Sequence, residues 1–416
     1  MIHGDSGAPR LVVIGGGAAG IFGALAAVEA NPAARVTVLE KSAQLLAKVR
    51  ISGGGRCNVT HACFEPRDFV RRYPRGHKAL IGPFHRFQAR DTVAWFAARG
   101  VELKVEADGR MFPVTDDSRT IIDALLGACQ EAGIELRTGM DVVDLQPRAG
   151  GGFALALKSG QRLEADRVLL ASGGLKAGRL RALLEAHGHT IAEPVPSLFT
   201  FNVETPWVRA LAGVSVPAAE TQVAGTKLRE RGPLLLTHWG MSGPGILKLS
   251  AWGARELAAR GYRFTLRVDW LPALKPGAVA EALEERRREH PAKCVVNVPL
   301  PPLPARLWER LVAEAGIGPE VRWSGLPAKR ARALAERLKA SEFAVTGKST
   351  NKDEFVTCGG VELREVDFKT LESRRLPGLH FAGEVLDIDG LTGGFNFQSA
   401  WTTGWLAGRA MAGVET

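Results

Sequence analysis

Hydrophobic and polar positions near the N-terminus alternate in a way that predicts a strand, a helix and a second strand. The apolar run at 11–14 (LVVI) has the length of a buried strand, and glycines follow it at once. An alanine-rich stretch at 18–30 then has the length of a helix that packs closely on a sheet. The next apolar alternation, at 34–41 (ARVTVLEK), predicts a strand that ends at Glu40.

The glycines between the first strand and the helix have the spacing of a dinucleotide-binding loop, Gly15-x-Gly17-x-x-Gly20. The first glycine permits a tight turn, the second lets a pyrophosphate approach the backbone, and the third lets the helix pack on the strand. The helix begins at Ala18 and Ala19, where unpaired N–H groups can bind the phosphates. The pattern therefore predicts a dinucleotide site.

Glu40 lies twenty residues after the last of these glycines, where an acidic residue binds the adenosine ribose in such folds. Its carboxylate can accept hydrogen bonds from the ribose hydroxyls and disfavours a 2′-phosphate, so we exclude NADP as the ligand of this loop. We expect Lys41 to contribute to the same site. FAD and NAD remain as alternatives at this point.

The C-terminal segment 379–408 favours FAD. A short predicted strand at 379–382 leads into glycines and acids, and a Gly-Gly pair then opens a helix that we expect to end near Gly408. FAD is long, so a second element must hold its ribityl chain and flavin. A helix N-terminus suits the N1–C2=O edge of the flavin, where negative charge accumulates on reduction. The expected cofactor contacts here are Gly383, Glu384, Asp387, Gly393, Gly394, Phe395 and Asn396.

Between these two ends, the alternation at 141–165 indicates a hairpin-like β unit that leads into a strand at 167–171. In FAD-binding folds such a unit supplies backbone contacts to adenine, and we assign that role to Val142 and Val143. The turn that follows, Ser172-Gly173-Gly174, is expected to pass under the cofactor.

Six longer motifs extend from one end of the chain to the other. They are VIGGGAAG (13–20), KVRISGGGRCNVT (48–60), GRMFPV (109–114), LLLTHWGMSGPGILKLS (234–250), VTCGGVELREVDFKTLESR (356–374) and GLHFAGEVLDIDGLTGGFNFQSAWTTGWLAG (378–408). With these motifs the chain resembles the BaiN/RdsA (YhiN-like) family of NAD(P)/FAD-dependent oxidoreductases. One segment departs from the family pattern, because 175–191 enters a helix almost directly after Gly174 where a longer loop is expected.

The resemblance implies an α/β fold with a Rossmann-like, two-part FAD-binding domain that is interrupted by an inserted β-barrel-like subdomain and a small helical subdomain. The expected FAD-binding parts are 1–190 and 346–416, and the expected insertion is 191–345, with the barrel at about 191–270 and the helices at about 275–340. The resemblance also implies reduction of carbon–carbon double bonds. Family members are linked to dihydrouridine in large-subunit ribosomal RNA, and others to unsaturated steroid acids.

In this fold the segment ISGGGRCNVT (51–60) runs beneath the flavin, where glycine lets main-chain N–H groups approach and any Cβ would collide. Arg56 would supply a fixed positive charge beside a reduced flavin or a substrate carbonyl, and Asn58 can bond a flavin or uracil-like edge. The expected cofactor contacts of this part of the chain are Lys48, Ser52, Gly53, Gly54, Gly55, Arg56, Cys57 and Asn58.

Reduction of an α,β-unsaturated carbonyl needs a hydride on one carbon and a proton from a positioned acid on the other. The candidate acids are Cys57, Cys358, His238 and Tyr73. We expect Cys57 or His238 to donate the proton, with Arg56 as a further catalytic residue. The alternative for Cys57 is a small buried hydrophobic residue, and for His238 a structural role. Arg110 and Ser242 are expected to contact the substrate.

The formal net charge of +10 and a sequence pI near 9.6 favour a polyanionic partner. Basic residues gather at 67–90, where aromatic residues are interleaved, and again at 284–290 and 327–340. Because the last two clusters lie in the insertion, we expect Arg330, Arg332 and Arg337 to contact ribosomal RNA. The alternative is that these helix faces only keep the insertion soluble.

Composition excludes several other classes of protein. No run of about eighteen apolar residues occurs, so we expect no membrane span. Five scattered cysteines form no C-x-x-C pair, so we expect neither disulfides nor a metal site, and a reducing cytoplasm is the simplest compartment. No second G-x-G-x-x-G follows a predicted strand, so NAD(P)H is expected as a transient reductant.

Two other functions compete with reduction of ribosomal RNA, and the sequence does not give the oligomeric state. One is an FAD-dependent oxidoreductase of a small unsaturated metabolite, whose basic surface would be incidental. The other is an RNA-binding flavoprotein whose FAD is not catalytic. The basic clusters favour RNA over a metabolite, whereas only turnover would exclude a non-catalytic FAD.

Overall fold

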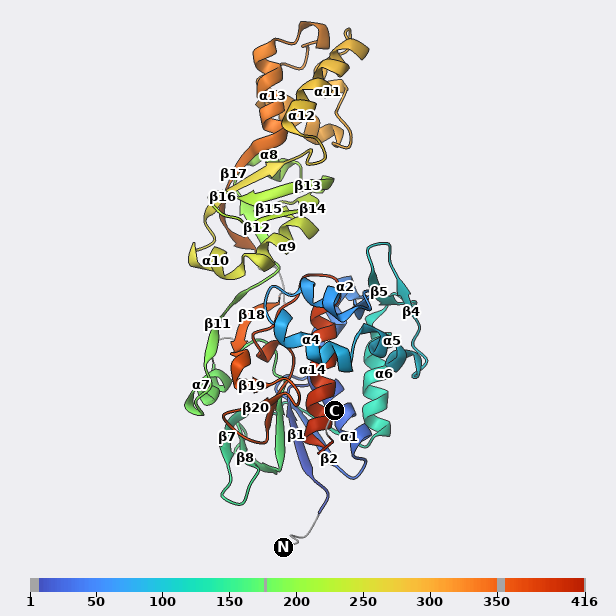
Figure 1. Cartoon of the computed structure of the whole chain (residues 1–416), viewed down its shortest axis with the longest axis vertical. Helices are drawn as coiled ribbons and strands as arrows, with labels where there is room; N and C mark the ends of the chain where they lie inside the picture. Colours follow the sequence, from blue (N-terminus) through green and yellow to red (C-terminus); the bar gives the residue numbers. More distant parts are fainter. Residues whose placement is uncertain (1–6, 176–177, 350–355, 415–416) are drawn as a thin grey trace. The chain divides into compact units, whose positions relative to one another are not determined.

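The chain folds into two units, and the first is assembled from both ends of the sequence (Figure 1). The computed structural model describes residues 7–175, 178–349 and 356–414. Unit 1 contains the residues up to Val195 and those from Val356 onward, and unit 2 contains Pro196–Phe355. Both boundaries lie slightly later in the sequence than the expected 190/191 and 345/346.

A mostly parallel sheet forms the centre of unit 1. In spatial order its strands are β19 (Val366–Asp367), β20 (Glu372–Ser373), β21 (Leu379–Phe381), β10 (Arg167–Leu170), β1 (Arg10–Ile14), β2 (Arg35–Glu40) and β6 (Glu135–Thr138). The central strands are buried on both faces, which is why they read as continuous apolar runs. Ile14 pairs with Leu170, and Leu170 with Phe381, so the turns after β1, β10 and β21 open at one edge of the sheet.

The first and last helices of the chain, α1 (Ala18–Ala30) and α14 (Phe395–Met411), pack on each other and on this sheet (Figure 1). A Cβ at Gly404 would lie 2.5 Å from the Ala19 carbonyl oxygen, and one at Gly408 would lie 2.1 Å from that of Gly23. The two backbones therefore touch, as only glycine allows. The expectation that the last helix ends near Gly408 is wrong, because this glycine serves the helix contact and not a C-terminal turn.

Three smaller sheets and several short helices complete unit 1. The sheets contain β3 (Thr60–His61), β5 (Arg110–Pro113) and β4 (Leu103–Val105); β7 (Val142–Pro147), β8 (Phe153–Leu157) and β9 (Arg162–Ala165); and β11 (Ile191–Pro196) with β18 (Thr357–Val361). The helices are α2 (Ala47–Gly55), α3 (Pro66–Phe69), η1 (Val70–Arg72), α4 (His77–Arg86), α5 (Ala89–Ala97), α6 (Ser118–Glu131), α7 (Arg179–Ala186), η4 (Leu363–Glu365) and η5 (Gly383–Val385).

Unit 2 consists of a closed barrel and a helical part. Around the barrel the strands are β12 (Thr200–Val203), β15 (Gly240–Ser242), β14 (Arg229–Leu236), β13 (Ser215–Val223), β16 (Phe264–Asp269) and β17 (Ser341–Ser349). The helices are α8 (Pro206–Ala210), α9 (Pro244–Trp252), α10 (Ala254–Ala259), α11 (Pro276–Glu289), η2 (Val295–Asn297), α12 (Ala305–Glu314), η3 (Trp323–Gly325) and α13 (Ala328–Ala340). These elements confirm the expected fold class, a two-part α/β domain interrupted by barrel-like and helical parts.

The barrel extends beyond the expected range of about 191–270. Its closing strand, β17, follows the helical part in sequence and pairs with both β12 and β16, so 191–270 alone does not close. Closure needs this strand because a barrel leaves no unpaired edge. Gly240 begins β15, and a Cβ there would lie 2.3 Å from the Phe201 carbonyl oxygen, so the close approach of β12 requires glycine.

Replacing Gly408 with alanine should destabilise unit 1, because the new Cβ would meet the Gly23 carbonyl oxygen at 2.1 Å. We expect the free energy of unfolding to fall by about 1–3 kcal/mol, measured by urea titration. Gly127→Ala is the matched control, since this glycine lies inside α6 with nothing within 4 Å of the new Cβ. That variant should gain about 0.5–1 kcal/mol, and equal midpoints for the two variants would contradict the packing argument.

Candidate cofactor site

The turn after β1 is shaped to let a phosphate approach from one side. Gly15 has a φ of +114°, and a Cβ there would lie 2.4 Å from the Ala171 carbonyl oxygen, so this position requires glycine. Gly17 has an ordinary φ of −86°, and nothing lies within 4 Å of its Cβ position. No side chain of the described residues caps the N-terminus of α1, which begins at Ala18, so its first N–H groups point to open space.

Glu40 is held at the end of β2 by two backbone hydrogen bonds. Its Oε2 accepts from the N–H of Gly16 and its Oε1 from that of Ser42, both at 2.8 Å. The carboxylate is therefore fixed, and each oxygen keeps a lone pair for a ribose hydroxyl. Beside it an open pocket of ≈ 470 Å³ leads to the start of β7, where Val142 is buried and Val143 half-buried; it is lined by Lys41, Gly139, Asp141, Lys158 and Ser159.

The turns after β10 and β21 meet the first loop at the same edge of the sheet. Gly173, which follows Ser172, has a φ of +78° and nothing within 4 Å of its Cβ position, whereas a Cβ at Gly174 would lie 2.3 Å from Thr357 Oγ1. A Cβ at Gly383 would lie 2.9 Å from the Cβ of Ala19. The C-terminal part of the chain therefore reaches the first turn of α1.

Lys48 and Glu384, expected cofactor contacts from distant parts of the sequence, form an ion pair. Lys48 Nζ lies 2.7 Å from Glu384 Oε2, which joins α2 to η5. The Glu384 side chain is the more buried of the two, with 19% of its surface exposed against 49% for Lys48. The pair therefore connects α2, which ends in the segment Ser52–Gly55 (the SGGG segment), to the turn after β21.

The SGGG segment ends α2 with a left-handed turn. The backbone leaves the right-handed helix at Ser52, and Gly53, Gly54 and Gly55 then have φ values of +57°, +72° and +88°. A Cβ at Gly53 would lie 2.8 Å from the Phe112 ring, whereas Gly54 and Gly55 have nothing within 4 Å. Three consecutive positive φ values explain the repeated glycine, and the open side is where a flat ring could approach the backbone.

Asn58 connects this segment to the start of α14. In the amide orientation that satisfies both groups, Asn58 donates to the Thr60 carbonyl at 3.1 Å and accepts from the N–H of Gly394 at 3.0 Å. Gly394 has a φ of +91°, and a Cβ there would lie 2.4 Å from the Thr60 carbonyl oxygen. The Asn58 amide therefore joins the two turns on which the flavin is expected to rest.

Tyr73 and Asn396 also fix the start of α14. The Tyr73 hydroxyl donates to the Phe395 carbonyl at 2.5 Å. Asn396 accepts from the N–H of Gly390 at 2.8 Å and donates to the Gly390 carbonyl at 2.9 Å, so it closes the loop before the helix. Burial raises the pKa of Tyr73 well above its usual value, and its proton is committed to the helix, so Tyr73 is a poor proton donor.

His61 contacts the same turn, although no motif assigns it a role. Its Nδ1 lies 3.1 Å from the Gly393 carbonyl oxygen, and since a carbonyl only accepts, Nδ1 carries the proton. Its ring stacks on Phe395 with the centroids 4.7 Å apart. Burial lowers the pKa of His61 below its usual value. The one sequence signal for this residue is its position directly after the motif KVRISGGGRCNVT.

Arg56 and Arg110 meet at Glu106. Arg56 Nη1 lies 2.6 Å from Glu106 Oε1, and Arg110 Nη2 lies 2.8 Å from Oε2. Both guanidinium groups also lie over the Phe112 ring, at 4.0 Å and 5.3 Å from its centroid. The structure thus brings together two arginines that were expected to have different roles, and it adds Glu106 as the anion they share.

The remaining candidate proton donors differ in exposure. Cys57 is completely buried, and burial raises its pKa to about 12, which makes the thiol a weak acid. Cys358 is completely buried as well. His238 lies exposed on the turn between β14 and β15 of unit 2, while the nearby Ser242 accepts a hydrogen bond from Thr200 at 2.9 Å. Exposure therefore favours His238.

The expected RNA contacts on α13 also differ from one another. Arg330 Nη1 donates to the Ala315 carbonyl at 3.3 Å, so this side chain helps to hold the helical part together. Arg332 and Arg337 are exposed, and their side chains have no ion pair or hydrogen bond among the described residues. The latter two are therefore the better candidates for binding a polyanion.

Four glycines that face unoccupied space, together with two helix N-termini, fit the binding of an FAD molecule. Gly17, Gly54, Gly55 and Gly173 direct their Cβ positions into space that no described atom occupies. The N-termini of α1, which no described side chain caps, and of α14, where Asn58 accepts from the N–H of Gly394, add two positive ends. In the described ranges no helix is long and apolar enough to cross a membrane, and no three His, Cys, Asp or Glu residues gather as metal ligands.

A Rossmann-type domain whose cofactor site is built from both ends of the chain defines an FAD-dependent oxidoreductase. The chain belongs to the HI0933-like family, since the family described as "HI0933-like protein Rossmann domain" matches residues 9–410. This membership confirms the resemblance that the motifs indicated.

Two curated relatives match almost the whole chain. This chain is 30% identical over 415 residues to the "Ribosomal RNA dihydrouridine synthase" of Escherichia coli (strain K12), and the match covers 97% of this chain and 98% of the relative. It is 31% identical over 412 residues to the "3-dehydro-bile acid delta(4,6)-reductase" of Clostridium scindens, with coverages of 97% and 99%. The fold resembles the 3-ketosteroid-delta4-(5alpha)-dehydrogenase of Rhodococcus jostii RHA1, at a TM-score of 0.52 and 15% identity over 99% of this chain and 98% of that one.

Gly17→Ala should weaken FAD binding without altering the protein fold. The new Cβ meets nothing within 4 Å in the protein and φ is ordinary, but it would occupy space that a pyrophosphate needs. We expect at least about tenfold weaker binding, or roughly 1.4 kcal/mol, measured as flavin bound per chain in titrations of the cofactor-free protein. Gly277→Ala in α11, which also meets nothing within 4 Å, should bind FAD normally. Normal FAD binding by Gly17→Ala would exclude this loop as the pyrophosphate site.

Stability should fall on mild acidification because of buried histidines. Burial lowers the pKa of His61, His189 and His380, so below their ordinary pKa of about 6.5 the unfolded chain binds more protons than the folded one. Stability should be full above about pH 7 and decrease below it, measured as the urea midpoint between about pH 8 and pH 5.5. In His61→Asn, the urea midpoint should fall less between about pH 8 and pH 5.5 than it does in the wild-type protein. A wild-type midpoint that stays constant or rises on acidification would contradict the burial argument.

Proposed function

We propose that this protein reduces a carbon–carbon double bond, and that its substrate is a uridine of large-subunit ribosomal RNA, which becomes dihydrouridine. The observation that carries the proposal is 30% identity, across almost the whole chain, to a curated ribosomal RNA dihydrouridine synthase. The net charge of +10 and the exposed arginines of α13 support a polyanionic substrate. NAD(P)H is the proposed reductant, and the cytoplasm the proposed compartment.

In the proposed reaction, uridine, NAD(P)H and a proton give dihydrouridine and NAD(P)⁺. When bound, FAD would accept hydride from the nicotinamide and deliver it to the base. The open side of Gly54 and Gly55 leaves room for a flat ring beside the backbone. The N-terminus of α14, fixed by Asn58 and Tyr73, would present its positive end to that ring, and Arg56, which Glu106 holds in place, would add positive charge.

The proposed proton donor is His238. Two hydrogen bonds shape its turn, since Thr237 Oγ1 accepts from the N–H groups of Trp239 at 3.3 Å and Gly240 at 3.1 Å. The ring is exposed and can therefore meet a substrate. The burial and high pKa of Cys57 instead suit a thiol that packs below the left-handed turn.

A small unsaturated metabolite is the second candidate substrate. It is supported by the 31% identity to the 3-dehydro-bile acid delta(4,6)-reductase, over nearly the full length of both chains. The chemistry would be the same, since a hydride and a proton again add across a double bond. The basic surface would then be incidental to catalysis.

The test follows oxidation of the reduced flavin under anaerobic conditions. After FAD has been reduced, unmodified large-subunit ribosomal RNA at low salt should restore the oxidised absorption band, and high salt should prevent this. His238→Asn should slow this oxidation by about 10²–10⁴-fold while leaving reduction by NAD(P)H unchanged, whereas Cys57→Ser should change little.

Oxidation by a small enone but not by RNA would support the metabolite instead. Oxidation by neither would refute both substrates. An unimpaired His238→Asn variant would leave the reaction in place and remove this residue as the proton donor.

A further inference from the structure

Unit 1 carries a basic surface, on α3, η1 and α4, that the cofactor site does not use. We define it by Arg67, Arg72 and Lys78, whose side chains are exposed. None of the three makes a side-chain hydrogen bond or ion pair with another described residue. Three exposed cations without a side-chain partner on one short stretch of chain are able to bind an anion.

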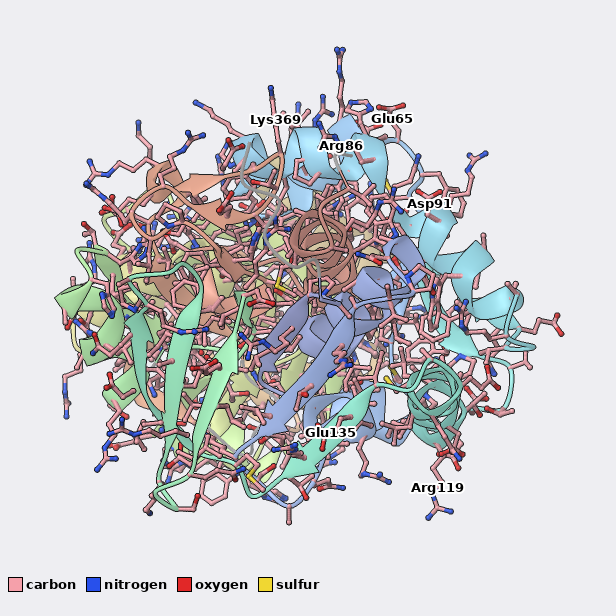
Figure 2. The ribbon with its side chains drawn as sticks, turned by 90° about the horizontal axis from the view of Figure 1, so that it is seen from below. Glu65, Arg86, Asp91, Arg119, Glu135 and Lys369 are labelled. Atoms are coloured by element: carbon pink, nitrogen blue, oxygen red, sulfur yellow. The ribbon has the colours of Figure 1, made fainter. Side chains whose placement is uncertain are left out.

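The other cations of this stretch are already engaged. Arg71 pairs with Asp68 at 3.2 Å, and Arg75 pairs with the buried Asp389. Arg86 Nη1 donates to the Lys369 carbonyl at 3.0 Å, and Figure 2 shows these two residues together on one rim of unit 1. These contacts engage the other cations and leave Arg67, Arg72 and Lys78 without a side-chain partner among the described residues.

The segment that carries the basic surface is hydrogen-bonded to the loop before α14. The Arg72 carbonyl accepts from the N–H of Leu391 at 2.8 Å, two residues before Gly393. A Cβ at Gly76 would lie 2.6 Å from the Ile388 side chain, so the turn that leads into α4 packs on the same loop. The backbone of this segment, at Arg72 and Gly76, therefore contacts the loop that leads to the turn on which the flavin is expected to rest.

Two further observations agree with this placement. Burial lowers the pKa of His61, and the positive charge of nearby Arg72 lowers it further. Phe64, which precedes α3, is 39% exposed, and the guanidinium of Arg90 lies 5.3 Å from its ring centroid. An aromatic face next to free cations is typical of surfaces that hold single-stranded nucleic acid.

We propose that Arg67, Arg72 and Lys78 bind the RNA phosphates that flank the target nucleotide. The proposal rests on the proposed function and adds where the strand is held. A base that reacts at a flavin must leave its stack, and the phosphates on either side must then be held in place. Cations that contact phosphates fix the position of the strand and carry no sequence preference.

The test compares RNA affinity at a series of salt concentrations. The variant Arg67→Gln/Arg72→Gln/Lys78→Gln should bind a large-subunit RNA fragment at least about tenfold more weakly at low salt. The slope of log affinity against log salt should decrease in magnitude by about 2 to 3, or roughly one for each phosphate that the variant no longer binds. Normal FAD content would show that the variant is folded.

A control variant removes the same charge elsewhere on unit 1. Arg35, Arg119 and Arg162 are exposed, with no side-chain partner among the described residues, and each is replaced by Gln. Figure 2 places Arg119 on the side of the unit opposite Arg86 and Lys369. This variant should keep nearly the wild-type slope, because none of its cations lies on α3, η1 or α4.

Each other outcome overturns the proposal in a recognisable way. Equal losses in the two variants would show that only net charge matters. A wild-type slope in the first variant, together with a reduced slope in Arg332→Gln/Arg337→Gln, would place the RNA on α13 and leave the proposed function intact. Absence of RNA binding by the wild-type protein would refute the proposed function and this proposal together.

Discussion

The backbone contact between α1 and α14 is the constraint on which the cofactor site depends. Gly404 faces Ala19, and Gly408 faces Gly23, so the two helices run in the same direction with their N-termini toward one edge of the sheet. Because α14 begins nine residues before Gly404, its N-terminus extends beyond that of α1 by about 12 Å, at 1.5 Å per residue. The two positive helix ends are thereby separated along one line, the first suited to phosphates and the second to a flavin.

A buried polar network keeps the second of these helix ends in register with the SGGG segment. Gln398 Oε1 accepts from Thr60 at 2.6 Å and from Thr92 at 2.9 Å, and its amide nitrogen donates to Thr402 at 3.1 Å. Trp401 Nε1 donates to the Val59 carbonyl at 3.0 Å. These groups are buried and mutually satisfied, so a shift of the helix would leave several of them unpaired, at a cost of about 1–3 kcal/mol each.

Features that depend on neighbours in sequence could be predicted, and features that depend on distant partners could not. The first glycine loop and the strand that ends at Glu40 could be predicted because each follows a local rule. The role of Gly408 could not, since a glycine that packs on another helix looks like one that ends a helix. The ion pair that brings Arg56 to Glu106, and the closure of the barrel by β17, likewise depend on partners that are distant in sequence.

The central sheet has a consequence for the life of the chain in the cell. β21 completes the parallel row beside β10, and α14 supplies the second helix end, yet both follow residue 378 in the sequence. A nascent chain therefore presents the whole first glycine loop long before it has anything to place opposite it. In the proposed site both helix ends hold the cofactor, so the complete site forms only after α14 has been made.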